Sequence, residues 1–113
     1  MARRTKGGMV YVSGQIGVDP TTGALATGGI GPQVEQAIRN VTAILATEGG
    51  ALGDVVKVSV FLADMSEFAS MNDVYSKMFS APYPARTTIG AGLGAGARVE
   101  IDAVAEVPPE KVI

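Results

Sequence analysis

Two segments of the chain alternate between apolar and polar residues, which is the pattern of a β-strand with one buried face. In residues 55–63 the face expected to be buried carries Val56, Val58, Val60 and Leu62. In residues 97–107 it carries Val99, Ile101, Ala103, Ala105 and Val107. Shorter segments at 9–12 and 85–91 predict two further strands. Residues 1–6 are expected to pair with 9–12 through a turn at Gly7-Gly8.

Two other segments repeat apolar residues every three or four positions, which predicts amphipathic helices. The first opens at Gly31-Pro32 and ends before Gly49-Gly50. Its buried stripe is expected to comprise Val34, Ala37, Ile38, Val41, Ile44 and Leu45. The second covers residues 67–79 and ends before the segment Ala81-Pro82-Tyr83-Pro84. Its inward stripe is expected to comprise Phe68, Met71, Tyr75, Met78 and Phe79, and Asn72 shares that face.

The order of these elements, β-β-α-β-α-β-β, predicts an α+β fold with a single mixed sheet and both helices on one face. The chain has 113 residues and is expected to form one domain, 1–113. Its mean hydropathy of +0.28 is high for so small a domain. Because no further helix remains to cover the second face of the sheet, we expect another subunit to cover it.

The residue composition excludes several kinds of chemistry. The chain has no cysteine and no histidine, which excludes disulfides, thiol nucleophiles, Cys/His zinc sites and histidine acid–base catalysis. The net charge is −2 and no basic stripe is present, so nucleic acid is not an expected partner. No apolar run approaches the roughly 18 residues of a membrane span, and no apolar segment of a signal peptide follows Arg3-Arg4. A cytoplasmic protein without a membrane partner is expected.

Two charged residues are the main candidates for chemistry. Arg86 begins a predicted strand, and its planar guanidinium can hold a carboxylate through two hydrogen bonds. A surface salt bridge is the alternative role of Arg86. Glu100 lies on the polar face of the last strand, two residues from Asp102, where it could serve chemistry or simply be solvated. The Asn72 amide could hold a ligand or support a loop.

A glycine-rich segment follows the candidate arginine. Gly90, Gly92, Gly94 and Gly96 resemble a phosphate-binding loop only in composition, because no Gly-Lys-Ser/Thr motif and no helix follow. A flexible hairpin between two strands is the simpler interpretation.

Five motifs follow one another along the chain: SGQI at 13–16, GDVVKVSVFL at 53–62, FASMNDVY at 68–75, YPARTT at 83–88 and VEIDAVA at 99–105. In this order and spacing they resemble the reactive-intermediate deaminase family, also called the Rid/YjgF family. The resemblance runs from about Gly7 to Ala105. Its most specific part is the Pro84-Ala85-Arg86 segment together with the strand that contains Glu100.

The resemblance implies a chorismate-mutase-like fold that assembles as a homotrimer, with clefts between the subunits. It also implies an enzyme that hydrolyses 2-imino acids, such as 2-iminobutanoate and 2-iminopropanoate, to 2-keto acids and ammonia. Neither a metal nor an organic cofactor is expected.

Roles for five residues follow from the same resemblance. Arg86 would clamp the carboxylate of the substrate, and Glu100 would position or activate the attacking water. Gly14 would line the pocket with its backbone, and Asn72 would support the pocket. Thr88 stands where many family members have a cysteine, and its backbone N–H would help to bind the substrate.

Three features depart from the family pattern. Family members carry a Gly-Pro-Tyr segment before the first strand, with the tyrosine near the pocket, and this sequence has none there. The connection from Arg86 to Glu100 is shorter, and Asp102 replaces a more usual glutamate. The alternative function is therefore a non-catalytic trimer that binds small carboxylates or a partner protein. A chorismate mutase is a third hypothesis, suggested by the fold alone.

Overall fold

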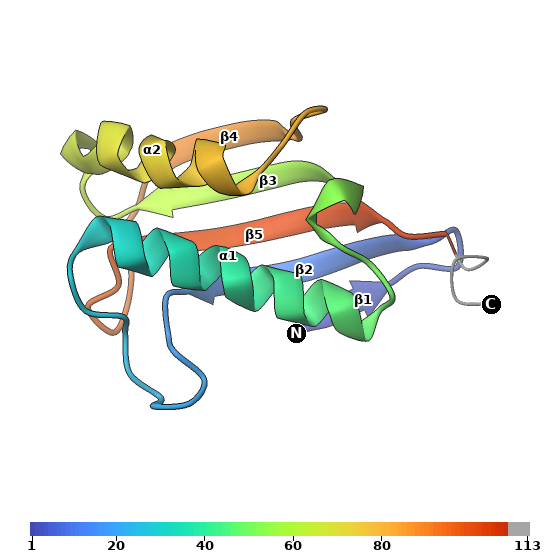
Figure 1. Cartoon of the computed structure of the whole chain (residues 1–113), viewed down its shortest axis with the longest axis horizontal. Helices are drawn as coiled ribbons and strands as arrows, with labels where there is room; N and C mark the ends of the chain where they lie inside the picture. Colours follow the sequence, from blue (N-terminus) through green and yellow to red (C-terminus); the bar gives the residue numbers. More distant parts are fainter. Residues whose placement is uncertain (109–113) are drawn as a thin grey trace.

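A computed structural model of the chain describes residues 1–108, in which five strands form one mixed sheet and two helices cover one of its faces (Figure 1). The strands are β1 (Ala2–Arg4), β2 (Met9–Ile16), β3 (Val55–Leu62), β4 (Ala85–Gly90) and β5 (Val99–Glu106). The helices are α1 (Ile30–Thr47) and α2 (Phe68–Met78), and short 3-10 turns at Leu52–Asp54 and Met65–Glu67 precede β3 and α2. The predicted α+β class and element order are confirmed.

The strands are ordered β1-β2-β5-β3-β4 across the sheet. β3 and β4 run parallel and are connected through α2, whereas every other neighbouring pair is antiparallel. The predicted hairpin between the last two strands is wrong, because β3 lies between β4 and β5. The glycine-rich segment instead carries the chain across β3, from one edge of the sheet to its centre (Figure 1).

The hydrophobic core lies between the sheet and the two helices. β5 buries the face predicted for it, with Val99, Ile101, Ala103 and Ala105 at most 2% exposed. α1 buries its predicted stripe except for Ile44, which is partly buried. In α2 the core positions are Met71 and Tyr75, whereas Phe68 is 37% exposed, so its prediction as a core residue is wrong. Burial of these apolar side chains is what fixes both helices on this face.

Because of a β-bulge at the start of β3, the burial observed there differs from the prediction. The register between β3 and β5 shifts between Val55 and Lys57, so that Val55 turns into the core and Val56 is 47% exposed. An extra residue in one strand reverses which side chains face the core on the N-terminal side of the bulge. The sequence gives no sign of this, because both Val55 and Val56 are apolar. From Val58 onward the predicted face is correct.

The other face of the sheet has no helix over it within residues 1–108 (Figure 1). Its side chains come from neighbouring register positions and include both apolar and charged groups: Tyr11 beside Val104, and Phe61 between Ile89 and Glu100. Tyr11 and Ile89 are nearly half exposed. Coverage of this open face by another subunit stays a prediction. No helix within residues 1–108 is both long and apolar enough to cross a bilayer.

The tight turn before β5 contains a strained alanine, which provides a test of the backbone. Ala95 and Gly96 both have positive φ, at 61° and 72°, and the Ala97 N–H donates to the Gly94 carbonyl. This geometry favours Asn-Gly, because asparagine tolerates the left-handed region better than alanine. Ala95→Asn is expected to raise the free energy of unfolding by about 0.5–1 kcal/mol. The measurement is the midpoint of urea unfolding, and Ala91→Asn is the control. An unchanged or lower midpoint in Ala95→Asn would contradict the left-handed conformation assigned to residue 95.

Candidate active site

Arg86 lies on the helix-covered face of the sheet, at its edge. It pairs in register with Val58, which is fully buried, so the two side chains project from the same face. There its Nη1 donates a hydrogen bond of 2.6 Å to Oδ1 of Asn72 on α2. The guanidinium carbon lies 4.6 Å from the ring centroid of Tyr75 and 5.5 Å from that of Phe68. These contacts hold the cation over two aromatic faces.

The helix α2 supplies these partners because of their spacing. Phe68, Asn72 and Tyr75 are four and three residues apart and therefore lie along one side of the helix. Asn72 was predicted from the sequence to share the apolar face, and its contact with Arg86 explains the polar group there. An amide that accepts from one arm of the guanidinium leaves the remaining N–H groups free to point elsewhere.

Arg86 is a partly buried cation without a carboxylate partner in the described part of the chain. Three other arginines there form ion pairs: Arg4 with Glu48, Arg39 with Glu35 and Arg98 with Glu67. Beside Arg86 lies a cavity of about 220 Å³, whose lining comprises Asn72, Tyr75, Ser76, Tyr83, Pro84 and Arg86. A guanidinium with free N–H groups at a cavity is suited to an anion with two oxygens.

Two hydroxyl groups near Arg86 are buried and make no hydrogen bond to any other residue of 1–108: those of Tyr75 and Thr88. Thr88 lies two residues after Arg86 and therefore on the same face of β4. Tyr75 is 5% exposed, and its ring stacks on Phe79 with centroids 4.5 Å apart. Burial raises the pKa of the Tyr75 phenol, and the nearby Arg86 cation opposes that rise. The phenol is therefore a protonated donor at neutral pH.

Glu100 lies on the opposite, open face of the sheet. Its neighbours in β5, Val99 and Ile101, are both in the core, so the side chain between them points away from the helices. Across the sheet it pairs with Ile16 on one side and Phe61 on the other. No hydrogen bond or ion pair within residues 1–108 engages its carboxylate.

Gly14 contacts the Glu100 carboxylate directly. A Cβ atom added to Gly14 would overlap with Oε2 of Glu100, although the backbone of Gly14 does not have the positive φ that requires glycine. Glycine at this position therefore leaves room for the Glu100 carboxylate as it lies in the structure.

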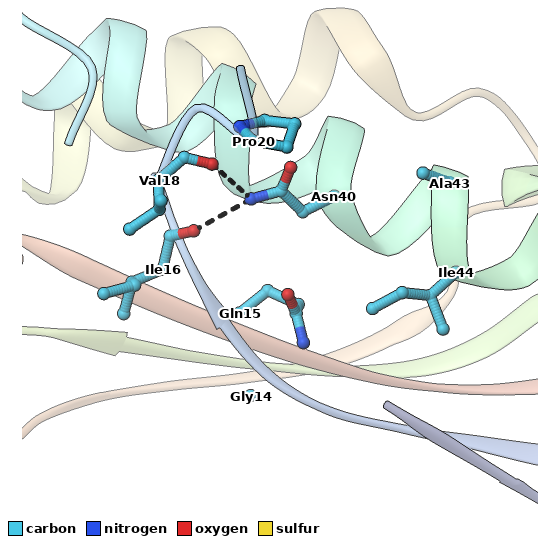
Figure 2. A pocket seen from close by; sticks show the side chains of 8 residues that line it. All are labelled: Gly14, Gln15, Ile16, Val18, Pro20, Asn40, Ala43 and Ile44. Atoms are coloured by element: carbon cyan, nitrogen blue, oxygen red, sulfur yellow. Dashed lines mark hydrogen bonds between the residues drawn. The ribbon is translucent and has the colours of Figure 1, made fainter. Parts of the chain in front are cut away.

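The segment that contains Gly14 is held in place by α1. A register shift between Val12 and Gln15 bulges β2 at this point. Beyond the bulge, the Asn40 amide donates to the carbonyls of Ile16, at 3.2 Å, and Val18, at 2.9 Å (Figure 2). A second cavity of about 410 Å³ lies between this segment and α1, and Figure 2 shows its mainly apolar lining. Asn40 thus fixes the end of β2 and, through it, the position of Gly14.

Gly14→Ala is expected to move the Glu100 carboxylate while the chain still folds normally. The added methyl group displaces the flexible end of Glu100, while the backbone can accept alanine. Because misplacement of a reacting group by about 1 Å can cost about a hundredfold in rate, we expect any turnover that uses Glu100 to fall by about tenfold to a hundredfold. The control is Gly53→Ala, since an added Cβ there meets nothing within 4 Å. Unchanged turnover in Gly14→Ala would show that the carboxylate position does not matter.

The five residues singled out from the sequence thus fall into two groups. Arg86, Asn72 and Thr88 lie at the edge of the helix-covered face, and Glu100 and Gly14 lie on the open face. The strand β3 separates β4 from β5, so one chain does not bring Arg86 and Glu100 to a common small ligand. Sequence analysis missed Phe68 and Tyr75 as partners of Arg86, since it assigned both to the core. Their spacing around Asn72 was the available signal.

Comparison with known proteins places this architecture in a family. Residues 2–107 match the profile of the family described as Endoribonuclease L-PSP. The chain belongs to this family, which is the Rid/YjgF family, and the resemblance found in the sequence is confirmed.

Named relatives and solved structures agree with that assignment. A Bos taurus protein named 2-iminobutanoate/2-iminopropanoate deaminase is 43% identical over 101 residues, which cover 88% of this chain and 74% of the relative. The structure of RidA from the Antarctic bacterium Psychrobacter sp. has a TM-score of 0.89 and 42% identity, covering 94% of this chain and 85% of that one. Escherichia coli TdcF with bound serine has a TM-score of 0.86 and 35% identity, covering 93% and 84%.

Proposed function

We propose that this protein is a deaminase that hydrolyses reactive 2-imino acids to 2-keto acids and ammonia. The observation that carries the proposal is Arg86: a partly buried cation, oriented by Asn72, free of any carboxylate within residues 1–108 and placed at a cavity. Relatives that carry the deaminase name at about 43% identity support the same reaction. The E. coli relative with bound serine supports a ligand of amino-acid size.

In this proposal Arg86 holds the carboxylate of the substrate. Its free N–H groups donate to the two carboxylate oxygens while Nη1 stays on Asn72. The Thr88 backbone N–H is a further donor, and the backbone of Gly14 lines the other side of the site. Fixing the carboxylate orients the neighbouring C=N carbon, which lowers the entropy cost of attack by water.

Glu100 acts on the water in this proposal. Water adds its oxygen to C2 of the protonated imine, and Glu100 accepts the proton that the water loses. Glu100 then returns this proton to the nitrogen of the resulting carbinolamine. The C–N bond breaks and ammonia leaves. The departing ammonia takes the proton of the C2 hydroxyl and becomes ammonium, so that the C2 oxygen becomes the keto group. The iminium carbon is already electrophilic, so a positioned carboxylate suffices for this reaction.

The proposed site needs more than one copy of the chain. Arg86 and Glu100 lie on opposite faces of the sheet, so each site would combine Arg86 of one copy with Glu100 and Gly14 of a neighbour. We infer a chorismate-mutase-like homotrimer in which a neighbour covers the open face. The partly exposed apolar side chains of Tyr11 and Ile89 on that face support this assembly.

The test is hydrolysis of 2-iminobutanoate generated in place by an enzyme that eliminates water from threonine. Semicarbazide traps the imine that remains, and keto acid and ammonia are measured in parallel. The protein is expected to shorten the lifetime of the imine and to release both products in equal amounts. If the imine lifetime does not change while 2-oxobutanoate still binds, the protein binds small carboxylates without catalysis, and the deaminase proposal is wrong.

A further inference from the structure

The packing of the Tyr75 ring does not explain why this residue carries a hydroxyl group. The residue is 95% buried, and the hydroxyl has no hydrogen-bond partner in the described part of the chain. A phenylalanine at this position could keep both the stack on Phe79 and the contact with the Arg86 cation. Burying an unpaired hydroxyl destabilises a fold, so this group calls for an explanation.

Tyr75 shares its cavity with a strong hydrogen-bond donor, the guanidinium of Arg86. The guanidinium carbon of Arg86 lies 4.6 Å from the centroid of the Tyr75 ring, and both residues line the same cavity of about 220 Å³. The single acceptor shown to engage Arg86, the Asn72 Oδ1 atom, is already occupied. Two donors, one of them charged, therefore line one cavity, which suits a ligand that carries several acceptors.

We propose that the Tyr75 hydroxyl donates a hydrogen bond to the carboxylate that Arg86 binds, and that it thereby makes the site select carboxylates over their uncharged amides. The inference rests on the proposed function for the location of the site but not for the reaction. A carboxylate offers about four acceptor positions on two oxygens, enough for both donors. An amide has only one acceptor oxygen, and its NH2 group would face the N–H and O–H donors of the protein without forming hydrogen bonds. Tyr75 is thus a determinant of specificity for the charged group.

Tyr75→Phe tests the proposal because it removes only the oxygen. Binding is measured by titration calorimetry on the full chain in its native assembly, with 2-oxobutanoate and its amide as probes. Because hydrogen bonds to charged groups are the strong ones, the Kd for 2-oxobutanoate is expected to rise by about tenfold to a hundredfold. The Kd for the amide should stay within about twofold of its wild-type value. If Tyr75 had only a structural role, Tyr75→Phe would leave the ratio of the two dissociation constants unchanged.

The control is Thr47→Val, which removes an exposed hydroxyl group at the end of α1. It should leave both dissociation constants unchanged. The ligand-free melting temperature of Tyr75→Phe should equal or exceed that of the wild type, since an unpaired buried hydroxyl is gone. An unchanged selectivity for the carboxylate in Tyr75→Phe overturns the proposal.

A second measurement uses the wild-type protein and needs no variant. The chain has three tyrosines, so ¹³C labelling at the ring carbon that bears the hydroxyl yields three resonances that can be assigned. Saturating 2-oxobutanoate should shift the Tyr75 signal, whereas the amide should not. A Tyr75 signal that ignores bound 2-oxobutanoate overturns the proposal, as does failure of 2-oxobutanoate to bind. If the carboxylate is selected but imines are not hydrolysed, the inference stands and the proposed function fails.

Discussion

Replacement of Arg86 by alanine is expected to lower kcat/KM for a 2-imino acid by at least about a hundredfold, since a charged hydrogen-bonding anchor for the substrate is lost. Arg86→Lys should be almost as damaging. A lysine ammonium is a point charge without the planar fork, and it cannot hold Asn72 and two carboxylate oxygens in the geometry of a guanidinium. The measurement is steady-state turnover at several imine concentrations.

The control for this prediction is Arg39→Ala. Arg39 pairs with Glu35 on the exposed side of α1, and such surface pairs contribute little to stability. Its removal should leave turnover unchanged. Full activity in Arg86→Lys would show that charge alone matters and that the fork held by Asn72 does not.

Replacement of Glu100 by glutamine is expected to lower kcat by about a hundredfold to ten-thousandfold, the usual contribution of a group that moves a proton in the transition state. Glutamine keeps the size of the side chain next to Gly14 but cannot accept the proton of the attacking water. Binding of 2-oxobutanoate should change little, because in the proposed site Arg86 supplies the main contact with the carboxylate. The measurements are kcat from turnover and Kd from calorimetry.

Glu106→Gln is the matched control, since Glu106 lies on the same strand and the same face as Glu100 but at its exposed far end. It should behave as the wild type. Equal losses of binding and turnover in Glu100→Gln would contradict a role in the chemical step and would point to a role in binding instead.

The sequence predicted the fold well because the patterns of the core were regular. The face of β5 and the stripe of α1 were read correctly from alternation and helical spacing. The predicted hairpin failed because no local signal distinguishes a turn between neighbouring strands from a crossing over a third strand. The bulge at Val56 was not predicted, because either of two consecutive valines can be buried in the core.

The candidate site residues could be named from the sequence, but their positions relative to one another could not be predicted. In residues 85–90 the apolar pattern would turn Ile89 inward, yet Ile89 is 47% exposed and Arg86 turns toward the helices. Partners on α2, namely Asn72 and two aromatic rings, stabilise the cation on that face. These partners come from another element, so the orientation of Arg86 depends on tertiary contacts and not on the local pattern. For the same reason Tyr75 was assigned to the core alone.

The central claim is that each site takes Arg86 from one copy of the chain and Glu100 from another. The most direct test mixes Arg86→Ala and Glu100→Gln chains in equal amounts, unfolds them together and refolds them. In a symmetric ring with random exchange, about a quarter of the sites receive both intact residues. We predict that the mixture regains about a quarter of wild-type turnover, although each variant alone is nearly inactive. A mixture no more active than the sum of the two variants would contradict a site shared between subunits.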